Sequence, residues 1–169
     1  MASCDNILPY IKPGWVGAEI GVQWGISAVA FLVHGVRFMY LVDPWKTYDG
    51  YGAPSPQADE VEEANFRRCR DTLSTYDNSC RYYAILRMPS EEAARFIPND
   101  LDFVWVDGNH GYHWVKDDLW RYWPKIRPGG VLCGHDYGLD PMFDVNRAVN
   151  EFAGGGLLAL GNMCWVIQK

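Results

Sequence analysis

The sequence predicts a single α/β domain in which a mostly parallel sheet lies between two layers of helices, and three observations predict it. Short apolar runs alternate five times with stretches of helical periodicity. Glycine or proline punctuates these runs, as at Gly21 and Pro44. Two more apolar runs, separated by Gly161-Asn162, predict a closing antiparallel hairpin. Successive βα units build a parallel sheet covered on both faces, and 169 residues suit one domain over residues 1–169.

The first half of the chain holds three predicted strands. Residues 15–20 form the first strand, which ends at Gly21, and a helix over 27–34 follows. The second strand, 37–42, stops at Asp43-Pro44 because proline lacks an N–H and restricts the residue before it. A Gly-, Pro- and Tyr-rich loop over 45–56 then leads to a charged helix over 59–73, and loops of this length are often functional. The third strand spans 81–86.

The second half of the chain continues the alternation. Ser90 predicts a helix N-cap, and acidic residues follow it at 91 and 92. The fourth strand covers 101–106, and the next helix, 112–123, ends near Pro124. Residues 127–130, Arg-Pro-Gly-Gly, predict a turn into the fifth strand at 131–134. A last helix over 145–152 precedes the hairpin runs 157–160 and 164–167.

Charge and hydropathy exclude several classes of partner. The 15 basic and 21 acidic residues give a net charge of −6, so we expect no nucleic-acid surface. Residues 1–6 lack the basic and apolar regions of a secretion signal, and no apolar run approaches membrane-spanning length. We therefore expect a soluble cytoplasmic protein that binds neither nucleic acid nor membrane.

Polar residues gather where the predicted strands end. Right-handed crossovers place the carboxyl ends of parallel strands on one edge of the sheet, and ligands bind at that edge. The residues predicted to meet there are Glu19, Asp43, Ser90, Asp107, His110, His135 and Asp136.

The loop after the first strand reads Glu19-Ile20-Gly21-Val22-Gln23-Trp24-Gly25. Gly21 lets the chain turn and approach a ligand closely, and Gly25 allows tight packing of the helix that follows. The N-terminus of that helix offers free N–H groups to a carboxylate. A tight turn without a ligand is the alternative interpretation, since the spacing of the glycines is a weak signal by itself.

These residues resemble class I S-adenosylmethionine-dependent methyltransferases, specifically the small-molecule O-methyltransferases that include catechol O-methyltransferase and its sugar- and antibiotic-modifying relatives. The resemblance covers residues 16–169 and is strongest at 19–27, 41–45, 106–110, 127–132 and 135–137. It implies a Rossmann-like three-layer sandwich with a seven-stranded sheet in the order 3-2-1-4-5-7-6. It also implies a cofactor site for S-adenosyl-L-methionine, made by Glu19, Gly21, Gln23, Gly25, Ser27, Asp43, Ser90 and Asp107.

Two of these cofactor residues, Asp43 and Ser90, could instead have a purely structural role. An acid that ends the second strand, here Asp43, accepts hydrogen bonds from ribose hydroxyls in such sites. Asp before Pro is also a common turn pair. Ser90 resembles the family's adenine-contact position and is equally a plain N-cap.

Many relatives carry N-terminal helices over the cofactor, whereas about fourteen residues precede the first strand here. We expect residues 45–52 of the long loop, or the partner in a homodimer, to cover the site instead, and the loop to help select the acceptor. The alternative is a surface loop with ordinary exposed tyrosines.

The resemblance also implies a metal site and a catalytic base. Asp107, His135 and Asp136 stand where the catechol enzymes hold magnesium. Magnesium prefers oxygen ligands and histidine favours zinc and its neighbours, so the expected divalent cation is Mg, Mn or Zn. The alternative has Asp107 orienting the cofactor while His135 and Asp136 bond to the neighbouring turn. His110 stands near the family's base position, and its ordinary pKa of about 6.5 suits that task.

We therefore predict His110 and Asp107 as the catalytic residues. The alternative for His110 is to cap the next helix or to pack on Trp114. Asp117 and Asp118, further along the same helix, are interpreted as solvated or capping residues.

Three functions compete. The first is methyl transfer to a hydroxyl of a small molecule such as a sugar, a phenol or a secondary metabolite. The second is a non-catalytic adenosyl-binding domain, although retention of His110 and Asp136 favours catalysis. The third is a nicotinamide-dependent oxidoreductase, which usually carries G-x-G-x-x-G. Gln23 replaces the second glycine of that pattern and would crowd a pyrophosphate.

Overall fold

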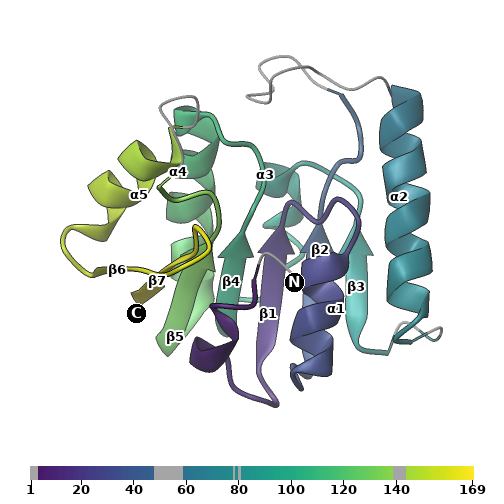
Figure 1. The fold of residues 1–169 in the computed structure, drawn as a ribbon, viewed down its shortest axis with the longest axis horizontal. Helices are drawn as coiled ribbons and strands as arrows, with labels where there is room; N and C mark the ends of the chain where they lie inside the picture. Colours follow the sequence, from purple (N-terminus) through teal and green to yellow (C-terminus); the bar gives the residue numbers. More distant parts are fainter. Residues whose placement is uncertain (1–3, 48–58, 78, 80, 139–143) are drawn as a thin grey trace.

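The structure is a computed structural model that describes residues 4–47, 59–77, 79, 81–138 and 144–169. Within these residues, seven strands form one sheet in the order β3-β2-β1-β4-β5-β7-β6 (Figure 1). The strands are β1 Val16–Ile20, β2 Phe38–Val42, β3 Tyr83–Leu86, β4 Leu101–Val106, β5 Ile126–Gly134, β6 Leu157–Ala159 and β7 Trp165–Gln168. The first five are parallel, and β7 runs antiparallel to both β5 and β6. The predicted fold class, strand order and closing hairpin are confirmed.

Helices cover both faces of the sheet (Figure 1). One apolar core lies under α1 and α2, and the other lies under α3, α4 and α5. The side chains of β4 alternate between the two cores, with Phe103 and Trp105 in the first and Val104 and Val106 in the second. The helices are α1 Ile26–Val33, α2 Asp59–Ser74, α3 Ser90–Ala93, α4 Tyr112–Tyr122 and α5 Val145–Ala153, with short 3₁₀ helices at Leu8–Tyr10 and Trp123–Lys125.

The register of the sheet brings the ends of five strands to one level. Ile20 pairs with both Val42 and Val106, Leu86 pairs with Val42, and Gly134 pairs with Val106. The residue that follows each of these strands therefore emerges at the same edge of the sheet.

No helix among the described residues is long and apolar enough to cross a membrane.

Two local predictions were wrong. Residues 127–130 belong to β5 and are not a turn before it, because Leu101 pairs with Ile126 while Phe103 pairs with Val131, and a register irregularity absorbs the extra residues. Ser90 is the first residue of α3 and not its N-cap. Pro89 holds the cap position, with no side-chain cap hydrogen bond.

Candidate active site

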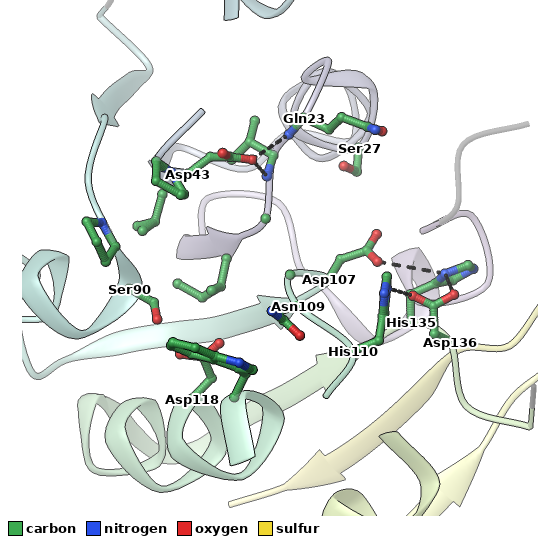
Figure 2. Close-up of a pocket in the computed structure, with 18 of the residues that line it drawn as sticks. Gln23, Ser27, Asp43, Ser90, Asp107, Asn109, His110, Asp118, His135 and Asp136 are labelled. Atoms are coloured by element: carbon green, nitrogen blue, oxygen red, sulfur yellow. Dashed lines mark hydrogen bonds and ion pairs between the residues drawn. The ribbon is translucent and has the colours of Figure 1, made fainter. Parts of the chain in front are cut away.

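A cavity of about 610 Å³ opens at the edge of the sheet where the parallel strands end (Figure 2). Its volume lies in the range of about 300–1,000 Å³ that is typical of small-molecule sites. Most of the predicted site residues line it, namely Gly21, Gln23, Ser27, Asp43, Ser90, Asp107, His110, His135 and Asp136. Glu19 and Gly25 do not line it. The sheet register therefore brings together residues from five separate parts of the chain, one after each parallel strand.

The glycine loop passes close to the end of β4. Gly21 has a left-handed φ of +86°, and a Cβ atom there would lie 2.1 Å from the carbonyl oxygen of Asp107. Gly25, the N-cap of α1, has φ +73°, and a Cβ there would lie 3.1 Å from Cys69 Sγ of α2. Gly25 thus serves packing between two helices, whereas Gly21 permits the approach of two backbones below the cavity.

Asp43 ties the glycine loop to the end of β2. Its Oδ2 accepts hydrogen bonds from the backbone N–H groups of Val22 and Gln23, each at 3.0 Å, and its Oδ1 accepts one from Trp45 N–H at 2.7 Å. Burial raises the pKa of Asp43, and these three hydrogen bonds oppose the rise. A carboxylate offers about four acceptor positions, so three local bonds leave one for a ligand hydroxyl. The turn interpretation and the ribose interpretation of Asp43 are therefore compatible.

Glu19 lies behind the cavity wall. Its side chain is fully buried, and its Oε1 accepts a hydrogen bond from the hydroxyl of Ser27, which does line the cavity. Its Oε2 is buried and has no hydrogen-bond partner among the residues that the structure describes. Burial raises the pKa of Glu19 well above its ordinary value, and the bond from Ser27 opposes this. Burial thus favours the protonated form of Glu19, and this carboxyl group holds the Ser27 hydroxyl in position.

We expect Glu19→Gln to stabilise the protein increasingly as pH rises. The folded wild type holds a proton on Glu19 that the unfolded chain releases above a pKa of about 4.3, so wild-type stability falls with rising pH. Gln reproduces the shape of the neutral acid without this linkage. Thermal unfolding at pH 5 and pH 8 measures the effect, with Glu92→Gln, at an exposed position, as the control for loss of an acid. A melting-temperature difference between Glu19→Gln and wild type that is equal or smaller at pH 8 would contradict the account.

Four polar side chains meet beyond the ends of β4 and β5 (Figure 2). His110 Nε2 lies 2.6 Å from Asp136 Oδ2. His135 Nδ1 lies 3.1 Å from Asp136 Oδ1 and 3.8 Å from Asp107 Oδ1. Asp136 has a left-handed φ of +60°, which is uncommon outside glycine and typical of functional sites. The carboxylate of Asp136 is therefore held between the two imidazole rings.

The two acids of this cluster differ in strength. Burial raises the pKa of Asp107 to about 6, although the charges of His135 and His110 oppose the rise. Burial also acts to raise the pKa of Asp136, but hydrogen bonds with His110 and His135 outweigh it and hold this pKa well below its ordinary value. For His135, burial acts to lower the pKa, while the bond to Asp136 and the charge of Asp107 raise it overall. Asp136 is thus the permanently ionised member.

The residues that could hold a cation differ from the predicted set. One ligand atom each from Asp107, His110 and Asp136 lies within 4.8 Å of the others. His135 is not in this group, although its Nδ1 lies within hydrogen-bond distance of Asp136 Oδ1. His110 takes the place that we predicted for His135. Two carboxylates and one imidazole are donors that suit zinc or manganese better than magnesium.

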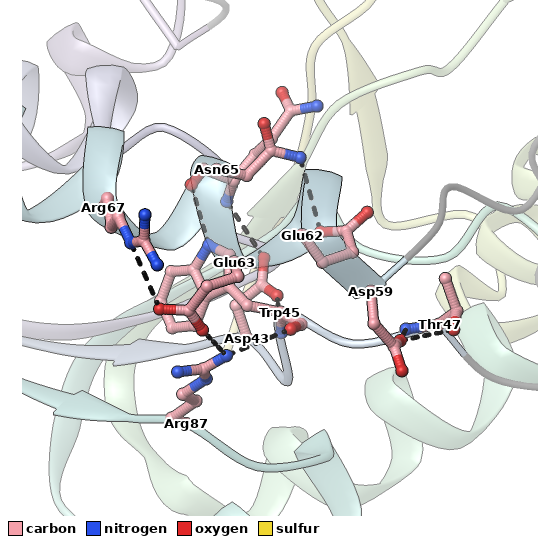
Figure 3. A network of polar contacts seen from close by, with 10 residues as sticks. Asp43, Trp45, Thr47, Asp59, Glu62, Glu63, Asn65, Arg67 and Arg87 are labelled. Atoms are coloured by element: carbon pink, nitrogen blue, oxygen red, sulfur yellow. Dashed lines mark hydrogen bonds and ion pairs between the residues drawn. The ribbon is translucent and has the colours of Figure 1, made fainter.

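Only the beginning of the predicted covering loop is described. Trp45 belongs to the buried core, with its side chain only 2% exposed. Its ring packs against Phe66, and its Nε1 donates a hydrogen bond to the Gln23 carbonyl at 2.9 Å. Figure 3 shows how this segment is held against α2: Arg87 pairs with Glu63 at 2.6 Å and also contacts the Trp45 carbonyl. Residues 48–52, the rest of the expected cover, lie outside the described residues, and the homodimer stays a prediction.

Asp118 and Trp24 are among the wall residues that sequence reasoning did not name as site residues. Asp118, interpreted as solvated or capping, is only 6% exposed and lines the cavity. Trp24 also lines it, and its Nε1 donates to Asn65 at 2.8 Å while Arg68 stacks 4.0 Å from the ring centre. Asp118 falls on the apolar stripe of α4 with Val115. A charged residue on a buried stripe is the signal that could have revealed it.

Several solved structures share this fold. An rRNA methylase from Streptococcus thermophilus matches with a TM-score of 0.65 and 14% identity, over 99% of this chain and 93% of that one. A precorrin 8w decarboxylase from Methanobacterium thermoautotrophicum matches with a TM-score of 0.63 and 16% identity, over 96% of this chain and 86% of that one. A precorrin-6y C5,15-methyltransferase from Geobacter metallireducens matches with a TM-score of 0.63 and 12% identity, over 95% of this chain and 82% of that one. At these identities the likeness shows the fold alone. No curated protein matches the sequence.

The family comparison covers the site as well as the fold. A family model described as a methyltransferase domain matches residues 18–137. That range runs from β1 to the residues just after β5, and it includes the glycine loop, Asp43, Asp107, His110 and Asp136. The chain therefore belongs to this methyltransferase family, within the class I S-adenosylmethionine-dependent enzymes.

Proposed function

We propose that this protein transfers a methyl group from S-adenosyl-L-methionine to a hydroxyl group of a small molecule, such as a sugar, a phenol or a secondary metabolite. One observation carries the proposal: the His110–Asp136 pair stands in the same cavity as the glycine loop and Asp43. A base and a cofactor-binding loop in one cavity are what methyl transfer to a hydroxyl requires.

The chemistry assigns a role to each group. The acceptor's hydroxyl oxygen forms a bond to the methyl carbon as the carbon–sulfur bond breaks, and S-adenosylhomocysteine leaves. The imidazole of His110 takes the hydroxyl proton. Asp136, 2.6 Å from His110 Nε2, orients the ring and would stabilise the imidazolium that forms. The N-terminus of α1, which follows the glycine loop along the cavity wall, suits the carboxylate of the methionine moiety.

Two alternatives are less well supported. A nicotinamide dinucleotide needs N–H groups of the glycine loop for its pyrophosphate, but Val22 N–H and Gln23 N–H both donate to Asp43. A non-catalytic adenosyl-binding domain has no need of a His–Asp pair at the far end of the cavity. The net charge of the chain, −6, supports a small molecule and not a nucleic acid as the methyl acceptor.

A divalent cation is the alternative to a histidine base at this end of the cavity. Asp107, His110 and Asp136 would hold it, and when bound it would lower the pKa of an acceptor hydroxyl. His110 bound in this way would not serve as the base, so the two roles of His110 exclude each other.

Turnover assays test the proposal. Protein is incubated with S-adenosyl-L-methionine and a panel of catechols, phenols and sugars, and S-adenosylhomocysteine and methylated product are measured by mass spectrometry. We expect both products together, and only with hydroxylated acceptors. Formation of neither product with any member of a broad panel would favour the non-catalytic domain.

Removal of metal separates the two roles of His110. If His110 is the base, we expect turnover to persist in the presence of a strong chelator, because the pair with Asp136 needs no metal. Turnover that is lost with chelator and restored by manganese or zinc would instead assign His110 as a ligand. Calorimetric titration of the chelated protein with each cation is the matching binding measurement.

A further inference from the structure

The turn between β6 and β7 has an unusual backbone. Asn162 and Met163 both have a left-handed φ of +57°, and Cys164 N–H donates to the Gly161 carbonyl at 3.4 Å across the turn. Two consecutive residues with positive φ are typical of a type I′ hairpin turn, in which asparagine and glycine are the usual residues. Met163 is neither. Its left-handed conformation is therefore strained and is maintained by the surrounding structure.

This turn contacts the chain on both sides of Asp136. Before Asp136, the carbonyl of His135 accepts a hydrogen bond from Nε1 of Trp165 at 3.1 Å. After Asp136, the backbone N–H of Tyr137 donates to the Met163 carbonyl at 3.0 Å. Asp136 itself has a left-handed φ of +60°. Both neighbours of this strained aspartate are thus held by the turn or by the strand that follows it.

The turn also holds the imidazole ring of His135. Burial acts to lower the pKa of His135, whereas the bond with Asp136, the charges of Asp107 and Asp136 and a hydrogen bond with the Asn162 backbone raise it. A hydrogen bond that raises the pKa of an imidazole favours its protonated form, so the Asn162 group is the carbonyl, which accepts. His135 Nδ1 lies 3.1 Å from Asp136 Oδ1. The ring therefore connects the turn to the carboxylate.

We propose that the turn 161–163 and Trp165 position Asp136 and, through it, the imidazole of His110. This inference rests on the role of base proposed above for His110. The Asp136 carboxylate lies between the two rings, with Oδ2 at 2.6 Å from His110 Nε2 (Figure 2). An aspartate that is not held in this way favours negative φ, and that rotation of the backbone turns its carboxylate away from His110. The turn touches no reacting atom, so its residues are positioning residues.

Two substitutions of Met163 test the turn in opposite directions. A β-branched side chain disfavours a left-handed backbone, whereas glycine adopts it freely. We expect Met163→Val to lower kcat by about 10- to 100-fold, the effect of misplacing a catalytic group by about 1 Å. Its affinity for S-adenosylhomocysteine, measured by calorimetry, is expected to match that of the wild type. Met163→Gly preserves the conformation of the turn and is expected to preserve kcat.

Gly154→Val is the matched control for strain. Gly154 is the C-cap of α5, has a φ of +54°, and a Cβ there meets nothing within 4 Å. We expect this variant to lose stability and to keep the wild-type kcat, because Gly154 is not part of the turn. A kcat of Met163→Val equal to that of Gly154→Val would overturn the inference.

Hydrogen exchange at the Tyr137 amide gives a second measurement, which needs no methyl acceptor. We expect faster exchange of this amide in Met163→Val than in Gly154→Val, because the Met163 carbonyl is its acceptor. Equal exchange in the two valine variants would overturn the inference. A wild type that methylates no acceptor would remove the proposed function, and the exchange measurement would still decide whether the turn holds this segment.

Trp165→Phe keeps the test decisive if Met163→Val does not fold. The variant retains an aromatic ring and removes the Nε1 donor to the His135 carbonyl. We expect kcat to fall by about tenfold, the value of one hydrogen bond, with unchanged affinity for S-adenosylhomocysteine. A wild-type kcat in Trp165→Phe would overturn the inference.

Discussion

His110→Ala is expected to lower turnover by about 10²- to 10⁴-fold, the usual contribution of a general base. The imidazole lies 2.6 Å from the Asp136 carboxylate at the far end of the cavity. Asp136 is the weaker base of the two, because hydrogen bonds with His110 and His135 hold its pKa well below the ordinary value although burial acts to raise it. Binding of S-adenosyl-L-methionine should change little, because the cofactor residues are separate side chains. The loss should appear in kcat at saturating cofactor, measured by formation of S-adenosylhomocysteine.

His113→Ala is the matched control for the loss of an imidazole. His113 lies in the first turn of α4, just after His110, is exposed, and packs its ring against Tyr112. We expect this variant to keep wild-type turnover. Turnover by His110→Ala at the wild-type rate would remove His110 from the mechanism, whatever the cofactor affinity.

Gly21→Ala is expected to destabilise the fold by about 4 kcal/mol or more, which exceeds the usual range for a single substitution. The new Cβ would lie 2.1 Å from the carbonyl oxygen of Asp107, a backbone atom that cannot move without shifting the end of β4. A melting temperature lower by roughly 10 °C or more is expected for a domain of this size. Binding of S-adenosyl-L-methionine should be lost with it, because the same shift displaces the cavity floor.

Gly14→Ala separates this clash from backbone strain. Gly14 has nearly the same φ, +84° against +86° at Gly21, and a Cβ there meets nothing within 4 Å. Its cost should be only the left-handed conformation, about 1–2 kcal/mol. Equal melting temperatures for the two variants would show that the approach of Gly21 to Asp107 is not a constraint on the fold.

The fold was predictable because local and long-range signals agree. β1, β2 and β4 are short apolar runs that end at Gly21, at Asp43-Pro44 and at Asp107, and the register of Ile20, Val42 and Val106 agrees with those ends. The error at 127–130 arose because Pro128 and Gly129 indicate a turn in the sequence. Only pairing with β4, which has no local signature, shows that these residues continue a strand with an irregular register.

The site was predictable where function depends on strand ends and less so elsewhere. Asp43, Asp107 and Asp136 each follow a strand, so topology alone brings them to one edge. The exchange of His135 for His110 in the metal-compatible group depends on side-chain rotation about Asp136, which no sequence pattern encodes. Asp118 depends on which face of α4 meets the cavity, and that is decided by packing against α3.

Direct titration of the purified protein with S-adenosyl-L-methionine tests the central claim most directly. We expect saturable binding of one molecule per chain, and no competition by NADH, because the N–H groups of Val22 and Gln23 are already bonded to Asp43. Calorimetry reports both the stoichiometry and the competition in one experiment. Absence of S-adenosyl-L-methionine binding, or its displacement by NADH at lower concentration, would contradict the assignment of this cavity.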